Sequence, residues 1–196
     1  VGSDMCIRYR YTLAGTLIKD LSERRAAEYR NRFIGFIFQS FNLIGFKTAV
    51  ENVELPLFYQ GVSRRKRHKM AMDYLDRLGL AQWAGHYPNE MSGGQKQRLS
   101  IARAIAKDPE IFIFDDSFSA LDFKTDSQLR KALKEYTKDA TTVIVAQRIS
   151  TILGADQIIV LDDGHMAGIG THKELMANCE VYQQIARSQL SEEELA

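Results

Sequence analysis

The sequence has little cysteine, little proline and almost no net charge. Its two cysteines, Cys6 and Cys179, cannot build a disulfide scaffold, so we expect a reducing compartment. Three prolines and 13 glycines in 196 residues exclude collagen-like and low-complexity chains. With 26 basic and 25 acidic residues, the formal net charge is +1, so bulk electrostatics gives no reason to expect a nucleic-acid partner.

Long apolar runs are also missing. The longest, such as residues 33–38 and 111–114, are far shorter than the ~20 residues of a membrane-spanning helix. No signal-peptide pattern opens the chain. The length is nevertheless sufficient to bury a core, so these features predict a soluble, intracellular globular domain.

Strand-like and helix-like segments alternate along the chain. Apolar runs predict three buried strands, at residues 33–38, 111–114 and 142–146. Residues 11–18 predict two short strands around a glycine turn, and residues 158–170 a hairpin turned at Asp163–Gly164. Helices are predicted after Ser22, Ser63 and Ser92, at residues 126–136, and after the capping box Thr171–Glu174. The alternation predicts an α/β domain with a largely parallel core sheet.

A basic run at residues 64–69 begins the helix that follows Ser63. It is either a nucleic-acid patch or a solvated helix face. We favour the solvated face, because no aromatic residues are interleaved within the run.

Polar residues follow each of the three predicted core strands: Gln39, the pair Asp115–Asp116, and Gln147. Ligands of open α/β sheets gather at the carboxyl ends of the strands. A carboxylate in this position is a common Mg²⁺ ligand in phosphoryl-transfer sites, although an aspartate after a strand is also frequent for structural reasons.

The segment Ser92–Gly93–Gly94–Gln95 is more specific. Two glycines at the start of a helix allow the backbone to approach a phosphate, and the helix N-terminus adds roughly half a positive charge. A glycine-rich helix entry without a ligand would explain the glycines, but not the residues around them.

Residues 91–98, Met-Ser-Gly-Gly-Gln-Lys-Gln-Arg, resemble the signature motif of ATP-binding-cassette ATPases. Four further segments of the chain resemble other motifs of that family, in the family's order. Phe38–Gln39 resembles the Q-loop, Ile111–Asp115 the Walker B strand, Ser119–Asp122 the D-loop, and Val145–Arg148 the switch loop. The resemblance covers roughly residues 12–188.

This resemblance implies ATP and Mg²⁺ as cofactors. Asp115 and Gln39 would hold Mg²⁺, and Gln39 would also sense the transmembrane domains of a transporter. The signature residues would contact ATP bound to a second nucleotide-binding domain: Ser92, Gly93, Gly94 and Gln95. Asp122 would lie at the interface of the two domains. The implied location is cytoplasmic, peripheral to the inner face of the cell membrane. No nucleic-acid partner is expected.

The resemblance also implies a P-loop-NTPase-like, mostly parallel sheet whose N-terminal part is incomplete. Residues 1–44 and 96–196 would form the ATPase core, and residues 45–95 a helical subdomain that ends in the signature motif.

The sequence departs from the family pattern in three places. No Gly-Lys-Ser or Gly-Lys-Thr occurs, so the P-loop is absent and its phosphate-binding lysine is missing. Asp116 stands where the family has a catalytic Glu, and Gln147 where it has a His. The shorter Asp116 carboxylate would fall about 1 Å short of the attacking water, and Gln147 cannot carry positive charge.

These departures predict that the chain's own nucleotide site is degenerate. Its intact signature motif would serve the nucleotide site of a partner in trans. The alternative is an ATPase-dead fragment or chimera that folds or dimerises without binding nucleotide. Residues 33–90 resemble lipoprotein-release and macrolide-efflux ATPases, and residues from 92 onward resemble multidrug exporters, which favours a mosaic. A cassette of DNA repair or chromosome structure is a weaker third possibility, because no long coiled-coil insertion is present.

Overall fold

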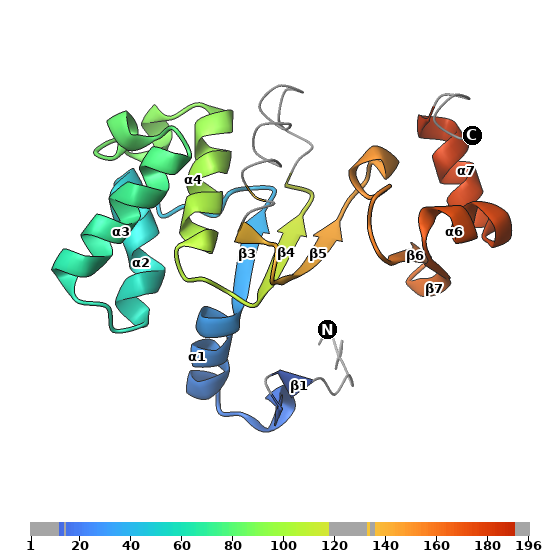
Figure 1. The fold of residues 1–196 in the computed structure, drawn as a ribbon, viewed down its shortest axis with the longest axis horizontal. Helices are drawn as coiled ribbons and strands as arrows, with labels where there is room; N and C mark the ends of the chain where they lie inside the picture. Colours follow the sequence, from blue (N-terminus) through green and yellow to red (C-terminus); the bar gives the residue numbers. More distant parts are fainter. Residues whose placement is uncertain (1–11, 14, 118–132, 134–135, 191–196) are drawn as a thin grey trace, which may run out of the picture.

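A computed structural model describes residues 12–13, 15–117, 133 and 136–190 (Figure 1). The predicted D-loop with Asp122, most of the helix predicted at 126–136, and Cys6 lie outside the described residues.

The centre of the structure is a three-stranded parallel sheet, which confirms the α/β class. Its order is β3 (Ile34–Phe38), β4 (Ile111–Asp115) and β5 (Thr141–Val145). The first core strand begins one residue later than predicted, because Phe33 is the last residue of helix α1 (Glu23–Phe33). Packing explains the glycine at position 35, because a Cβ there would lie 2.8 Å from Cγ of Pro109.

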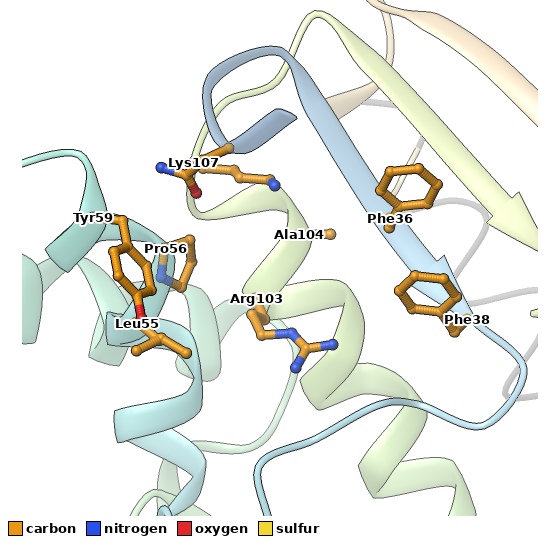
Figure 2. Close-up of a pocket in the computed structure, with 9 residues that line it drawn as sticks. Phe36, Phe38, Leu55, Pro56, Tyr59, Arg103, Ala104 and Lys107 are labelled. Carbon is orange, nitrogen blue, oxygen red and sulfur yellow. The ribbon is translucent and has the colours of Figure 1, made fainter. Parts of the chain in front are cut away.

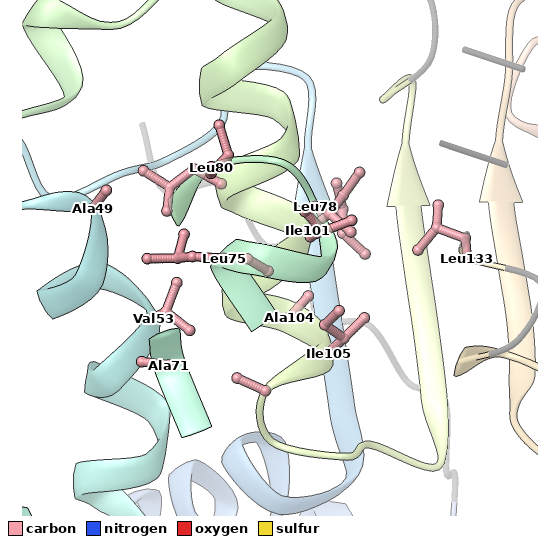
Figure 3. Close-up of a cluster of buried hydrophobic side chains, with 14 of the residues drawn as sticks. Ala49, Val53, Ala71, Leu75, Leu78, Leu80, Ile101, Ala104, Ile105 and Leu133 are labelled. Carbon is pink, nitrogen blue, oxygen red and sulfur yellow. The ribbon is translucent and has the colours of Figure 1, made fainter. Parts of the chain in front are cut away.

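Three helices lie together beside the sheet: α2 (Ala49–Tyr59), α3 (Arg64–Arg77) and α4 (Gly93–Ile105) (Figure 1). Apolar residues at helical spacing bury against one another and against the sheet (Figure 3). The cluster includes Val53, Leu57, Leu75, Leu99, Ile101, Ile105, Phe112 and Phe114. Leu99, Ala102 and Ile105, which share one face of α4, are all buried.

The helix ends follow the sequence signals. Thr48 begins α2 with a reciprocal capping box to Glu51. Gly79 follows α3 with φ 67°, a conformation that glycine adopts without strain. Most of the basic run at the start of α3 is solvent-exposed, and Arg67 turns back to pair with Glu54 over 3.1 Å. This exposure agrees with a solvated helix face, and the choice of that interpretation over a nucleic-acid patch stays a prediction.

The last part of the chain forms its own small core beyond β5, on the side away from α2–α4 (Figure 1). The antiparallel hairpin β6 (Ile158–Asp162) and β7 (His165–Gly170) turns at Asp163 and Gly164, with φ of 44° and 78°. Two positive φ values in succession are those of a type I′ turn, and the hairpin turns at the predicted residues. Helices α6 (His172–Asn178) and α7 (Glu180–Gln189) follow, and α6 begins at the predicted capping box.

The remaining elements are short. β1 (Thr12–Leu13) and β2 (Thr16–Leu17) form the predicted hairpin around Gly15. Single 3₁₀ turns connect larger elements at Ile18–Asp20, Ala81–Trp83, Pro88–Glu90 and Ile149–Thr151. In the described ranges, no helix combines the length and the apolar character needed to cross a membrane.

Candidate functional site

The carboxyl edge of the sheet brings together polar residues that are far apart in sequence. Gln39 follows β3 directly, and Asp116 follows β4. Phe38 and Asp115 are register partners, so the chain leaves both strands at the same level. Nε2 of Gln39 donates to Oδ2 of Asp116 over 3.2 Å. Two of the three predicted polar strand ends are therefore in direct contact.

Asp116 has an unusual backbone. Its φ is 44°, and its N–H donates to the carbonyl of Val145 over 2.9 Å. Aspartate is one of the few non-glycine residues that tolerate the left-handed region, and residues held there cluster at functional sites. The hydrogen bond to β5 fixes the backbone from which the Asp116 carboxylate reaches Gln39.

Two buried polar residues that the sequence analysis did not single out support this edge. Ser117 Oγ donates to the carbonyl of Ile37 over 2.7 Å, and Nε2 of Gln97 donates to the carbonyl of Ser117 over 2.7 Å. Both side chains are at least 98% buried. They join β3, the turn after β4 and helix α4. A sequence signal existed, because Gln97 precedes Ile101 and Ala104 by four and seven residues on the buried face of α4.

The signature residues form the first turn of α4, which starts on the side of the sheet where the strands end (Figure 1). Ser92 Oγ accepts from the N–H of Gln95 over 3.4 Å, and Oε1 of Gln95 accepts from the N–H of Ser92 over 2.7 Å. Gln95 thus serves the helix cap in this structure. Ser92 and Gly93 are exposed, so this turn is accessible to a ligand outside the chain.

The two glycines of this turn have no structural reason within the described residues. A Cβ added to Gly93 or Gly94 would meet no atom within 4 Å, and neither glycine has a positive φ. Glycine is a poor helix former, costing about 1 kcal/mol relative to alanine inside a helix. Crowding and backbone strain therefore do not explain the pair, and close approach by a molecule outside the chain stays a prediction.

Gln147 lies two residues after β5, beside the C-terminal helices. Its carbonyl accepts from Nε2 of Gln189 in α7 over 2.9 Å. A hollow of about 470 Å³ is lined here by Gln147, Arg148, Ser150, Gln189 and Leu190. The catalytic role of Gln147 stays a prediction, as does the interface role of Asp122.

The oxygen donors at the sheet edge fit part of a Mg²⁺ shell. Asp115 is exposed at the end of β4, and Gln39 directly follows Phe38, which is the register partner of Asp115. Among the described residues, no group of three or more His, Cys, Asp or Glu side chains is placed to hold a metal ion. This donor set suits Mg²⁺, which takes one or two protein carboxylates and completes its shell with phosphates and water.

A second cavity, of about 220 Å³, lies between β3, α2 and α4 (Figure 2). Its walls include Phe36, Phe38 and Tyr59, together with Arg103 and Lys107 of the α4 end. Burial, with the nearby charge of Arg103 as a second cause, lowers the pKa of Lys107 to about 8. Burial also lowers the pKa of Arg103.

Comparison with known proteins gives the family. The family model described as "ABC transporter" matches residues 7–119. The chain belongs to the ABC transporter family. An uncharacterised ABC transporter ATP-binding protein of Thermotoga maritima is 38% identical over 158 residues, which cover 80% of this chain and 68% of that protein. The macrolide export ATP-binding/permease protein MacB of Vibrio parahaemolyticus is 36% identical over 86% of this chain and 26% of its own length.

The fold agrees with that membership. The dimeric structure of MJ0796, a bacterial ABC transporter cassette, matches with a TM-score of 0.75 and 37% identity, covering 81% of this chain and 71% of the cassette. The chain is therefore an ABC transporter nucleotide-binding domain with the P-loop-NTPase-like α/β fold that the sequence predicted.

Proposed function

We propose that this cassette is the ATP-binding component of an ABC transporter and that it presents its Ser92–Gly93–Gly94 turn to a nucleotide held by a second cassette. The observation that carries the proposal is the turn itself. It is capped, exposed and built with two glycines that the rest of the described chain does not require. N–H groups of a helix's first turn bind phosphate oxygens, and the missing Cβ atoms allow that approach.

The site on this cassette's own sheet edge is proposed to be degenerate. Asp116, where the family has a Glu, is already hydrogen-bonded to Gln39 and has a shorter reach. Gln147 stands where the family has a His, and an amide cannot carry positive charge. Asp115 and Gln39 would hold Mg²⁺, which neutralises phosphate charge when a nucleotide is bound. Asp122 would lie at the interface of the two cassettes, and Gln147 would donate a hydrogen bond to the γ-phosphate where the family has a His.

The partners follow from the same proposal: a second cassette and the transmembrane domains of a transporter, at the inner face of a membrane. Related proteins support both, since the MJ0796 structure is dimeric and MacB is an ATP-binding/permease protein. Residues 45–95, which carry α2 and α3, would be the helical subdomain, and the remainder the ATPase core. We further propose that the chain is a mosaic of macrolide-efflux-like and exporter-like parts.

The test is a mixing experiment. The MJ0796 cassette, with its own signature serine replaced, keeps its P-loop but lacks the group it needs in trans. Adding this cassette should restore MgATP hydrolysis in proportion to the amount added, while this cassette alone should hydrolyse nothing measurable. The same experiment with Gly94→Ala tests the turn itself. Its matched control is Gly85→Ala, because Gly85, like Gly94, has open space around it and no positive φ.

The alternative is a cassette that folds or pairs without nucleotide. It predicts no restored hydrolysis and no thermal shift with MgATP, either alone or with the partner. Restored hydrolysis at the partner's site would exclude it. Family-typical hydrolysis by the isolated cassette would instead overturn the proposed degenerate site.

A further inference from the structure

The turn that follows Gln39 has a strained backbone. Phe41 and Asn42 have φ values of 63° and 46°, although neither is a glycine. Two short hydrogen bonds close the turn, from the Phe41 N–H to the carbonyl of Phe38 (3.1 Å) and from the Asn42 N–H to the carbonyl of Ser40 (2.7 Å). Consecutive non-glycine residues in this region persist only when the surroundings hold them.

Arg103 of α4 supplies that support. Its Nη2 donates to the carbonyl of Phe41 over 2.9 Å, and its Nη1 donates to the carbonyl of Asn42 over 2.6 Å. Figure 2 shows the guanidinium reaching away from α4 toward the end of β3. The side chain is partly buried, and the planar fork of a guanidinium is suited to hold two acceptors at once.

The far half of the same loop is held by a different residue. Asn52 of α2, which is fully buried, accepts from the N–H of Ile44 and donates to the carbonyls of Ile44, Lys47 and Thr48. The loop from β3 to α2 therefore has two anchors. Only the Arg103 anchor belongs to the helix that begins at Ser92.

We propose that Arg103 is a positioning residue that ties helix α4, and hence the Ser92–Gly93–Gly94 turn, to the strained turn that sets Gln39 against Asp116. A nucleotide seated on the first turn of α4 would thereby restrain Gln39 at the other site. The link between Arg103 and the turn rests on the two hydrogen bonds alone. The effect of a nucleotide at one site on Gln39 at the other rests on the proposed function.

Amide hydrogen exchange on the full chain tests the tie directly. In Arg103→Met, exchange at the Phe41 and Asn42 amides should rise about tenfold, because local opening is no longer opposed by the guanidinium. Arg103→Lys, a milder change that offers one point donor, should give a smaller rise. The Ile44 amide, bound by Asn52, should change little. The matched control is Arg98→Lys, which alters a guanidinium on the same helix that donates to the carbonyl of Leu78.

Unchanged exchange at Phe41 and Asn42 in Arg103→Met would show that Arg103 does not hold the turn. An equal rise at Ile44 and along β3 would show that Arg103 contributes general packing and has no positioning role. A second measurement adds the signature-deficient MJ0796 cassette with MgATP. Exchange should fall at Ser92–Gln95 in both the unsubstituted chain and Arg103→Met, but at Phe41 and Asn42 in the unsubstituted chain only. No protection at Ser92–Gln95 counts against the proposed function and leaves the first measurement to decide the tie. Protection there without any at Phe41 counts against the relay.

Discussion

Replacing Gly94 with alanine should make the isolated cassette more stable and less able to serve a partner. Gly94 is the second residue of α4, its φ is not positive, and an added Cβ would have no atom within 4 Å. Alanine is therefore compatible with the native backbone. It also restricts the unfolded chain, which should stabilise the fold by about 0.4–1 kcal/mol. For a chain of this length, that corresponds to a rise in Tm of about 1–4 °C.

The same methyl group should obstruct a phosphate outside the chain. It would project where the proposal places the partner's nucleotide, and a displacement of about 1 Å can cost about 10²-fold in rate. We therefore expect restored hydrolysis in the mixing experiment to fall by about that factor. Gly85→Ala should raise Tm similarly and leave the restored rate unchanged.

Opposite signs for stability and trans activity are the diagnostic result. A destabilised Gly94→Ala cassette would show that the fold needs this glycine, and the argument from open space would be wrong. Full trans activity in a folded Gly94→Ala cassette would show that no ligand approaches this turn.

Three further outcomes follow from the described contacts. Ser117→Ala removes the hydroxyl that donates to the carbonyl of Ile37 and leaves that buried acceptor without it, so urea unfolding should show a loss of about 1–3 kcal/mol; no loss would mean that the edge is held elsewhere. Gly164→Ala places a side chain at φ 78° in the hairpin turn, and calorimetry should show a loss of about 1 kcal/mol or more, whereas an unchanged Tm would contradict the turn geometry. Lys107→Met should stabilise the fold at pH 7 by on the order of 1 kcal/mol, because a partly buried charge is removed. The native pKa of about 8 lies below the usual lysine value, so between pH 8 and about 10.5 the unfolded chain binds the proton more strongly and the unsubstituted protein gains stability as pH rises. The advantage of Lys107→Met should therefore shrink over that range, and a constant difference in pH-dependent melts would refute the assignment.

Local signals in the sequence predicted much of the fold. The hairpin at Asp163–Gly164 and the caps at Ser92 and Thr171 were placed correctly, because each depends on residues within a few positions. The boundary at Phe33 was wrong by one residue. An apolar residue there suits a buried helix end as well as a strand, and hydrophobicity alone does not separate the two.

Side chains that bond to distant backbone could not be predicted in the same way. Gln97 reaches the carbonyl of Ser117, Ser117 reaches that of Ile37, and Arg103 reaches those of Phe41 and Asn42. These pairs are separated by 20 to 80 residues, and no local pattern names the acceptor. The composition of the site edge was therefore predicted from motifs, whereas the residues that hold it in place were not.

The placement of those supporting residues gives α4 a specific mechanical role. Gln97 bonds to the backbone of Ser117, which adjoins Asp116, and Arg103 bonds to the turn that follows Gln39. The helix thus contacts both segments whose side chains meet in the Gln39–Asp116 hydrogen bond, and its first turn is the exposed Ser92–Gly93–Gly94 segment. A rigid shift of α4 would act on both partners of that hydrogen bond together. Both contacts of α4 are made to backbone carbonyls, so they would move the two segments without replacing the hydrogen bond between Gln39 and Asp116.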